Sequence, residues 1–214
     1  MDSFQKSIFQ TLVYADIFSY PLTFDQLKKF LITSKKIDFG IDDISKAKGV
    51  LKREKYFFLK GRSGIIKERV KRERYAREKT KIAQKTARIL KLIPFIKMVG
   101  ITGNLAMKNT DQRDDIDFLI ITSKDRLWLS RFLVVFLLEF LGKRRHPRDK
   151  EVKNKICLNM FLDEDHLKIP QKEQNLFSAH EVLQFKPLWQ RENIYDDFLN
   201  QNQWVKKFLA NWKN

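Results

Sequence analysis

The segment that most restricts the fold is a run of apolar residues headed by two aspartates. Residues 115–122 read Asp-Ile-Asp-Phe-Leu-Ile-Ile-Thr, which predicts a strand. Because alternate side chains of a strand point to one face, Asp115 and Asp117 are expected to point together. Ile116 and Phe118 are expected on the opposite face.

Adjacent carboxylates repel and are costly next to a core, so a divalent cation would stabilise them. Oxygen ligands favour Mg²⁺ or Mn²⁺. A plain surface turn with solvated acids is the competing interpretation of this segment.

A glycine precedes these acids at a defined interval. Gly103 and Asn104 are followed by ten residues, 105–114, and then by Asp115. Glycine lets the backbone approach a ligand closely, and amides at the start of a following helix can hold phosphate oxygens. Thr102 directly precedes this glycine and is included in the candidate phosphate site. A phosphate site facing two metal-binding carboxylates is the arrangement that nucleotidyl transfer requires.

The spacing resembles the signature of the nucleotidyltransferase superfamily typified by DNA polymerase beta: Gly-Ser, about ten residues, then Asp-x-Asp in an apolar strand. The chain is also similar to bacterial proteins described as nucleotidyltransferase-domain proteins, through Ala106 and the segments 125–128, 155–162 and 179–181.

By this resemblance Gly103 and Asn104 would contact the β- and γ-phosphates of an NTP. Asp115 and Asp117 would be the catalytic metal ligands for Mg²⁺ or Mn²⁺. The implied reaction transfers a nucleoside monophosphate to an acceptor, a nucleic acid or a protein, that the sequence does not identify.

Two positions depart from the signature. Asn104 replaces the serine, and the third carboxylate, which the family carries on a later strand, is replaced by Asn159 in the expected strand 155–162. A neutral amide oxygen would hold a second metal ion weakly. Asp163, just past that strand, is the alternative ligand. A nucleotide-sensing or nucleic-acid- or protein-binding module with lost catalysis is therefore kept as a second function, and an antitoxin-like role as a third.

The residues around this segment predict an α+β domain, a small mixed sheet flanked by helices, over residues 76–214. A basic helix over 68–93 is expected to connect it to the amino-terminal part, with a solvated face as the favoured interpretation and phosphate tracking as the alternative. Strands are expected over 95–100, 116–122 and 155–162, and helices over 124–141, 173–184 and 194–212.

Residues 1–75 predict a winged-helix-like domain. Helices are expected over 4–18, from Phe24 to about Ile32 and after Asp42, the last with Ile44, Ala47 and Leu51 on one face. Thr23 and Gln26 form a capping-box pattern before the second helix. A hairpin is expected between 56–59 and 65–66. The third helix could enter a DNA groove through Lys46, Lys48, Lys52 and Arg53, but it lacks base-reading residues, so packing on the rest of the chain or on a partner is favoured.

Charge and composition narrow the class of protein. Forty-three Lys and Arg against 26 Asp and Glu give a formal net charge of +17, which attracts polyanions. A hydrophobic share of 43% excludes full disorder. The basic loop 142–154, with Arg144, Arg145 and Arg148, is expected to be solvated, with a triphosphate or nucleic-acid clamp as the alternative.

The remaining features favour a cytoplasmic protein. The single Cys157 excludes an internal disulfide and a cysteine zinc site. The polar start, residues 1–6, carries no signal-peptide pattern. The apolar stretch 127–141 is interrupted by Arg131 and Glu139 and is expected to be a buried helix rather than a membrane span. No membrane partner is expected, and the oligomeric state is not predicted.

Overall fold

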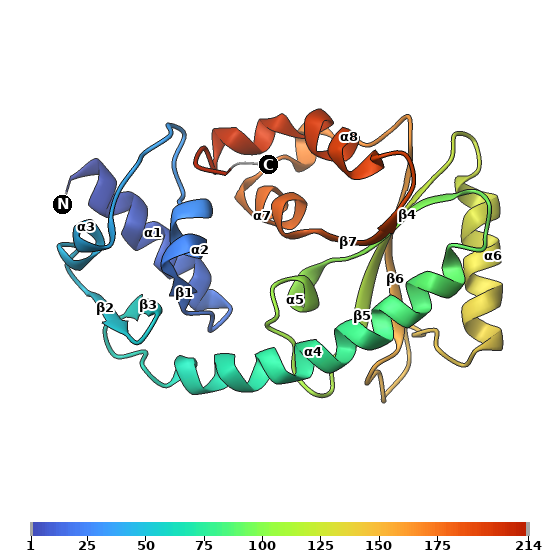
Figure 1. Cartoon of the computed structure of the whole chain (residues 1–214), viewed down its shortest axis with the longest axis horizontal. Coiled ribbons are helices and arrows are strands. Elements are labelled where there is room, and N and C mark those ends of the chain that lie inside the picture. Colours follow the sequence, from blue (N-terminus) through green and yellow to red (C-terminus); the bar gives the residue numbers. More distant parts are fainter. Residues whose placement is uncertain (1, 213–214) are drawn as a thin grey trace. The chain divides into compact units, whose positions relative to one another are not determined.

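The computed structural model describes residues 2–212, which form two compact units of an α+β protein (Figure 1). The first unit comprises residues 2–71, Gln174–His180 and 204–212, and the second comprises Arg72–Glu173 and Glu181–Gln203. Helices α4 (Ile65–Leu90) and α7 (Leu176–Gln184) contribute residues to both units. The predicted division at residue 75 stays a prediction.

The first unit combines short helices with a three-stranded antiparallel sheet of order β1-β3-β2. Its further elements are α1 (Ser3–Ile17), β1 (Leu22–Thr23), α2 (Phe24–Lys29), α3 (Ile41–Ser45), β2 (Val50–Arg53) and β3 (Tyr56–Leu59). The predicted capping box at α2 is confirmed: the backbone N–H of Gln26 donates to Thr23 Oγ1 and that of Thr23 to Gln26 Oε1. This reciprocal pair satisfies two N–H groups that have no partner inside the helix.

The hairpin predicted between residues 56–59 and 65–66 is wrong in its second strand. Strand β3 pairs with β2, not with residues 65–66, and Leu51 lies exposed in β2 instead of on a third helix. Ile65 and Ile66 begin α4, and they are buried with Tyr56 and Phe58. The error arises because a short apolar run beside glycines fits a strand or a helix start equally well.

The second unit is built on a four-stranded mixed sheet of order β6-β5-β4-β7. Strands β4 (Ile96–Ile101) and β5 (Ile116–Thr122) are antiparallel, β5 and β6 (Ile156–Asp163) are parallel, and β7 (Lys186–Gln190) is antiparallel to β4. The limits of β5 are as predicted, and those of β4 and β6 differ by one residue at each end. Strand β7 was not predicted.

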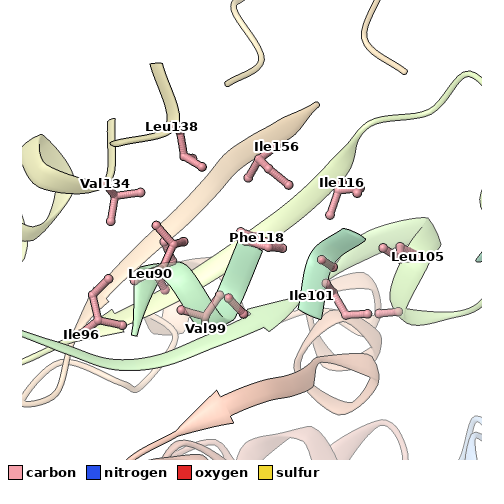
Figure 2. Packing of buried hydrophobic residues seen from close by; sticks show 14 of the residues in the cluster. Leu90, Ile96, Val99, Ile101, Leu105, Ile116, Phe118, Val134, Leu138 and Ile156 are labelled. Carbon is pink, nitrogen blue, oxygen red and sulfur yellow. The ribbon is translucent and has the colours of Figure 1, made fainter. Parts of the chain in front are cut away.

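One core of this unit lies between the sheet and helices α4 and α6 (Leu127–Phe140). Figure 2 shows Leu90 from α4 and Val134 and Leu138 from α6 beside strand residues such as Phe118 and Ile156. Ile116, Phe118 and Ile120 of β5 all belong to this core, so the alternate residues Asp117, Leu119 and Ile121 occupy the other face, as the sequence predicts.

Helix α6 is not buried as predicted. Ser130, Val134 and Leu138 are its buried residues, spaced four apart along one face. The opposite face carries Trp128, Phe132, Phe136 and Phe140, which are 79%, 65%, 65% and 81% exposed. A helix beside an edge strand covers the sheet with one stripe only, which explains why an almost entirely apolar helix is half solvated. None of the helices within residues 2–212 is both long and apolar enough to cross a membrane.

The carboxyl-terminal helix is shorter than predicted. Helix α8 (Ile194–Gln201) has Asn202 as its C-cap and is followed by a 3₁₀ turn, η2 (Gln203–Lys207). Another 3₁₀ turn, η1 (Gln171–Glu173), precedes α7. The Asn202 side chain donates to the carbonyl oxygens of Leu167 and Phe198 and accepts from the N–H of Ile169. A buried amide with three partners fixes the chain direction here and ends the helix.

Candidate functional site

The two aspartates of the signature lie together at the start of β5. Asp117 is the second residue of this strand and is in register with Cys157 of β6. A carboxylate oxygen of Asp115, one of Asp117 and Sγ of Cys157 all lie within 4.8 Å of one another. The strand alternation thus brings both carboxylates to one place, as predicted, and adds a thiol that the sequence analysis had not placed there.

The glycine of the signature faces the second aspartate. Thr102 follows β4 and is the N-cap of the short helix α5 (Gly103–Ala106), and its N–H donates to the carbonyl oxygen of Asp117 at 3.1 Å. Gly103 has φ +58°, and a Cβ built on it would lie 3.0 Å from Oδ2 of Asp117. The backbone conformation and the contact both favour glycine at this position.

Asn104 is exposed in the first turn of α5. Its carbonyl oxygen accepts from the N–H of Asn109 at 2.8 Å, which closes the segment after α5. With four residues, α5 has little helix dipole. Any phosphate here would therefore be held by individual N–H and side-chain groups.

The predicted third ligand lies beside the glycine segment. Asn159 of β6 donates from Nδ2 to Oγ1 of Thr102 at 3.4 Å, and it sits where the register between β5 and β6 is irregular. The alternative ligand, Asp163, is in register with Thr122 at the opposite end of β6, and it accepts from the N–H groups of Asp125 and Asp165. Asp163 therefore does not reach the aspartate pair.

Arg145 is fixed at the site and does not belong to a free loop. Nη1 of Arg145 donates to Oδ2 of Asp115 at 2.7 Å and contacts Sγ of Cys157 at 3.6 Å. Its backbone N–H donates to the carbonyl oxygen of Ile156, which ties the loop to the start of β6. Arg144 pairs with Glu139 on α6. The neighbouring carboxylate raises the pKa of Arg145, so the guanidinium is a permanent positive charge here.

Burial and the repulsion between negative charges govern the protonation of Asp117 and Cys157. Burial raises the pKa of Asp117 and the charge of Asp115 adds to this, while a hydrogen bond from Cys157 and the charge of Arg145 act against it. Burial and then the charge of Asp117 raise the pKa of the Cys157 thiol. The thiol therefore stays protonated near neutral pH and is a weak metal ligand.

Glu181 of α7 lies at this site, and the sequence did not identify it as a site residue. Burial raises the pKa of this carboxyl, the charge of Asp117 raises it further, and a hydrogen bond from the backbone N–H of Gly103 lowers it. The sequence carried one signal, because Glu181 lies in one of the segments similar to nucleotidyltransferase-domain proteins. The neighbouring His180 stacks on Tyr14 at 4.3 Å between ring centroids, and burial lowers its pKa to about 4.

Lys79 of α4 holds the segment that leads into Asp115. This lysine is 2% exposed, and its Nζ donates to the carbonyl oxygens of Gln112 and Asp114 and to Oδ1 of Asn154. Burial lowers its pKa, and the carboxylates of Asp114 and Asp115 oppose that shift. Three acceptors around one ammonium group fix the position of this segment.

The donor set fits one hard divalent cation. Two carboxylates are available, the thiol is protonated, and Mg²⁺ in proteins is commonly held by one or two carboxylates together with phosphate oxygens and water. Within residues 2–212, no third carboxylate completes the group of atoms that lie within 4.8 Å of one another. The residues therefore suit a single Mg²⁺ or Mn²⁺ better than a pair.

Comparison with known proteins gives distant structural matches only. No family model and no curated protein matches the sequence. A solved structure described as a toxin–antitoxin with AMP-PNP is 13% identical, with a TM-score of 0.34, and the match covers 57% of this chain and 89% of that one. A mutant of the toxin–antitoxin MntA–HpeT is 14% identical, with a TM-score of 0.32 and coverage of 54% and 82%. Likeness this low carries no argument, so the chemistry of the site rests on the contacts within this chain.

Proposed function

We propose that this chain is a nucleotidyltransferase that binds a Mg²⁺- or Mn²⁺-bound NTP and transfers a nucleoside monophosphate to an acceptor hydroxyl. The contact that carries the proposal joins Gly103 to Asp117, since any Cβ on this glycine would lie 3.0 Å from the carboxylate. A solvated surface turn requires neither this close approach nor two partly buried carboxylates whose charges oppose each other.

The reaction is a displacement at the α-phosphorus of the NTP. The acceptor oxygen forms a bond to that phosphorus, the bond to the oxygen that bridges to the β-phosphorus breaks, and pyrophosphate leaves with both electrons of that bond. The acceptor proton passes to solvent. Asp115 and Asp117 would hold the divalent cation, which would neutralise phosphate charge and favour departure of pyrophosphate.

Other side chains of the site would bind and orient the nucleotide. Thr102 and Asn104 would donate from their side chains to phosphate oxygens, and Gly103, which has no side chain, would let a phosphate approach the backbone closely. The N–H of Thr102 is already bonded to the carbonyl oxygen of Asp117 and that of Gly103 to the carboxyl group of Glu181. Once the cation binds Asp115, Arg145 would be free to contact phosphate. Its guanidinium suits bidentate binding of a phosphate. Asn159, hydrogen-bonded to Thr102, would orient that side chain.

Ligand-induced stabilisation tests the binding step. Mn²⁺ with a non-hydrolysable ATP analogue at a hundred times its Kd is expected to stabilise the protein by ~2.7 kcal/mol. That corresponds to about 5–10 °C in the unfolding midpoint at about 2–4 °C for each kcal/mol. The double variant Asp115→Asn, Asp117→Asn should lose the shift. Asp165→Asn, an exposed acid paired with Lys124, should keep it. Absence of a shift with all four NTPs would contradict the proposal.

Transfer itself is tested with α-³²P-labelled NTPs, the full chain, and RNA, DNA or protein as acceptor. Label in the acceptor together with pyrophosphate release, both dependent on Asp115 and Asp117, is the expected result. Tight nucleotide binding without transfer would favour the second candidate, a nucleotide-sensing module. The observation that favours this second candidate is the neutral Asn159 in place of a third carboxylate.

The first unit is proposed to be a winged-helix domain. The sheet order β1-β3-β2 and the helices that precede the β2–β3 hairpin support this assignment. Helix α3, Ile41–Ser45, has only five residues, and Lys46 after it pairs with Asp43. A helix this short offers few side chains to a DNA groove, which supports a packing role over DNA reading.

A further inference from the structure

Helix α4 carries a row of cations on one exposed face. Arg74, Arg77, Lys81, Lys85 and Arg88 follow one another at intervals of three and four residues, and all five are exposed. Such intervals place side chains on one side of a helix. We call these five residues the α4 basic row. At a rise of 1.5 Å per residue it is about 21 Å long.

The basic row is not used to hold the fold together. Among the described residues, none of the five forms an ion pair with a carboxylate. Other cations of the same helix do have structural partners: Arg72 pairs with Asp111, and Lys79 is buried against the segment before Asp115. The row lies on the face turned away from that burial. Five unneutralised cations in line repel one another, so an anionic ligand would stabilise them.

A cavity lies at the first three members of the row. Its volume is about 540 Å³, and it is lined by Arg74, Arg77 and Lys81 together with Ala76, Glu78, Thr80 and Lys108. Lys108 comes from a different segment, two residues beyond α5, so two separate parts of the second unit direct cations to one hollow. The lining has four cations against one carboxylate.

We propose that the α4 basic row and Lys108 form a binding site for the phosphodiester backbone of a nucleic acid strand. The phosphates of a free nucleotide lie together in one short chain, which a row of about 21 Å exceeds. A strand presents a negative charge at every nucleotide and can contact successive cations. In the described structure no aromatic side chain lines the hollow, so backbone contacts without base reading are expected. No residue of this site belongs to the aspartate group, and the proposal stands independently of nucleotidyl transfer.

Binding of labelled single-stranded oligonucleotides to the full chain tests the proposal. Fluorescence anisotropy would be measured with mixed-sequence RNA and DNA strands of about 20 nucleotides over a salt series, since log K falls by ~0.7 for each phosphate contact per tenfold rise in salt. The triple variant Arg77→Gln, Lys81→Gln, Lys85→Gln removes three contacts. Its affinity should fall at least tenfold, and its salt slope should decrease by about 2.

A matched variant separates a local site from general attraction to a basic protein. Lys36→Gln, Lys206→Gln, Lys207→Gln removes the same charge from exposed lysines of the first unit and should change the affinity less than twofold. Equal losses in both triple variants, or binding of a poly-glutamate peptide as tightly as of the strands, would overturn the proposal. Lys108→Gln provides a second test that leaves α4 intact, with an expected loss of two- to threefold. Asp115→Asn, Asp117→Asn should retain strand binding, so failure of the transferase proposal and failure of this one are distinguishable.

Discussion

Nη1 of Arg145 lies 2.7 Å from Oδ2 of Asp115, so the guanidinium compensates part of the negative charge to which a divalent cation would bind. The Asp115 side chain is 16% exposed and that of Arg145 is 38% exposed. Solvent screens the pair in part, which limits its contribution to stability to about 1 kcal/mol. The contact therefore matters more for competition with a cation than for the fold.

Arg145→Gln is expected to lower stability and to strengthen binding of the free cation. Loss of the pair should lower the unfolding midpoint by about 2–4 °C, because Asp115 and Asp117 lose their compensating charge. Mn²⁺ alone should bind several-fold more tightly by calorimetry, since no guanidinium competes for Asp115. The Mn²⁺-bound NTP analogue should bind more weakly if Arg145 contacts phosphate. Weaker binding of Mn²⁺ alone to the variant would contradict this account.

Gly103→Ala is expected to damage the site more than its backbone strain alone explains. At φ +58° an alanine costs roughly 1–2 kcal/mol, and its Cβ would press on the Asp117 carboxylate. Gly142 offers a matched control, because it has φ +62° and nothing lies within 4 Å of a Cβ built on it. Chemical denaturation of Gly103→Ala and Gly142→Ala compares the two costs. Only Gly103→Ala should also reduce the Mn²⁺-induced thermal shift, and equal behaviour of the two variants would mean that the contact with Asp117 is unimportant.

Local patterns predicted the part of the fold that holds the aspartates. The limits of β5 and the common direction of Asp115 and Asp117 follow from a strand period of two, which a single apolar run determines. The placement of Gly103 against Asp117 came from the interval in the resemblance, since no local rule states which strand lies beside β5. Strand β7 was missed because Lys186–Gln190 contains a proline and has no regular alternation.

Charged residues were the least predictable from the sequence. Lys79 and Arg69 lie in a run of basic residues that predicts a solvated face, yet they are 2% and 3% exposed. Lys79 is buried because three oxygen acceptors surround its ammonium group, and Arg69 because its guanidinium lies over the ring of Tyr20 and donates to the carbonyl oxygen of Pro21. These partners are distant in sequence, so composition alone does not reveal them. Arg145 and Glu181 were difficult to assign for the same reason.

Asp117→Asn is expected to stabilise the cation-free protein. Burial and Asp115 raise the pKa of Asp117, so its ionised form is disfavoured in the folded state relative to the unfolded state. At pH 7 ionisation of Asp117 therefore costs folding free energy, and a neutral amide removes that cost. Each ~1 kcal/mol gained corresponds to about 2–4 °C in the unfolding midpoint.

The same substitution should abolish the cation-induced thermal shift. A carboxylate that lowers stability and supports ligand binding has the signature of a functional residue. The control is Asp114→Asn, because Asp114 accepts from Thr110 and from the N–H of Asp111 and its loss should destabilise the loop. A cation-free Asp117→Asn protein that unfolds at a lower temperature than the unmodified chain would contradict the electrostatic account.

His180 makes the stability of the first unit dependent on pH. Its ring stacks on Tyr14 and on Phe30, and burial lowers its pKa from 6.5 to about 4. As the pH falls, the unfolded chain binds a proton at this histidine near pH 6.5, whereas the folded chain binds it only near pH 4. The contribution of His180 to the free energy of unfolding should therefore be constant above about pH 6.5 and fall by up to ~3 kcal/mol towards pH 4.

The variant His180→Phe isolates this contribution, because it keeps an aromatic ring between Tyr14 and Phe30 and has no proton to bind. Denaturant unfolding at pH 7, 5.5 and 4 should show a smaller loss of stability for His180→Phe than for the unmodified chain. His166→Gln serves as the control, because it replaces a histidine whose side chain is 84% exposed. Parallel curves for His180→Phe and the unmodified chain would show that His180 binds its proton equally well in the folded and unfolded states.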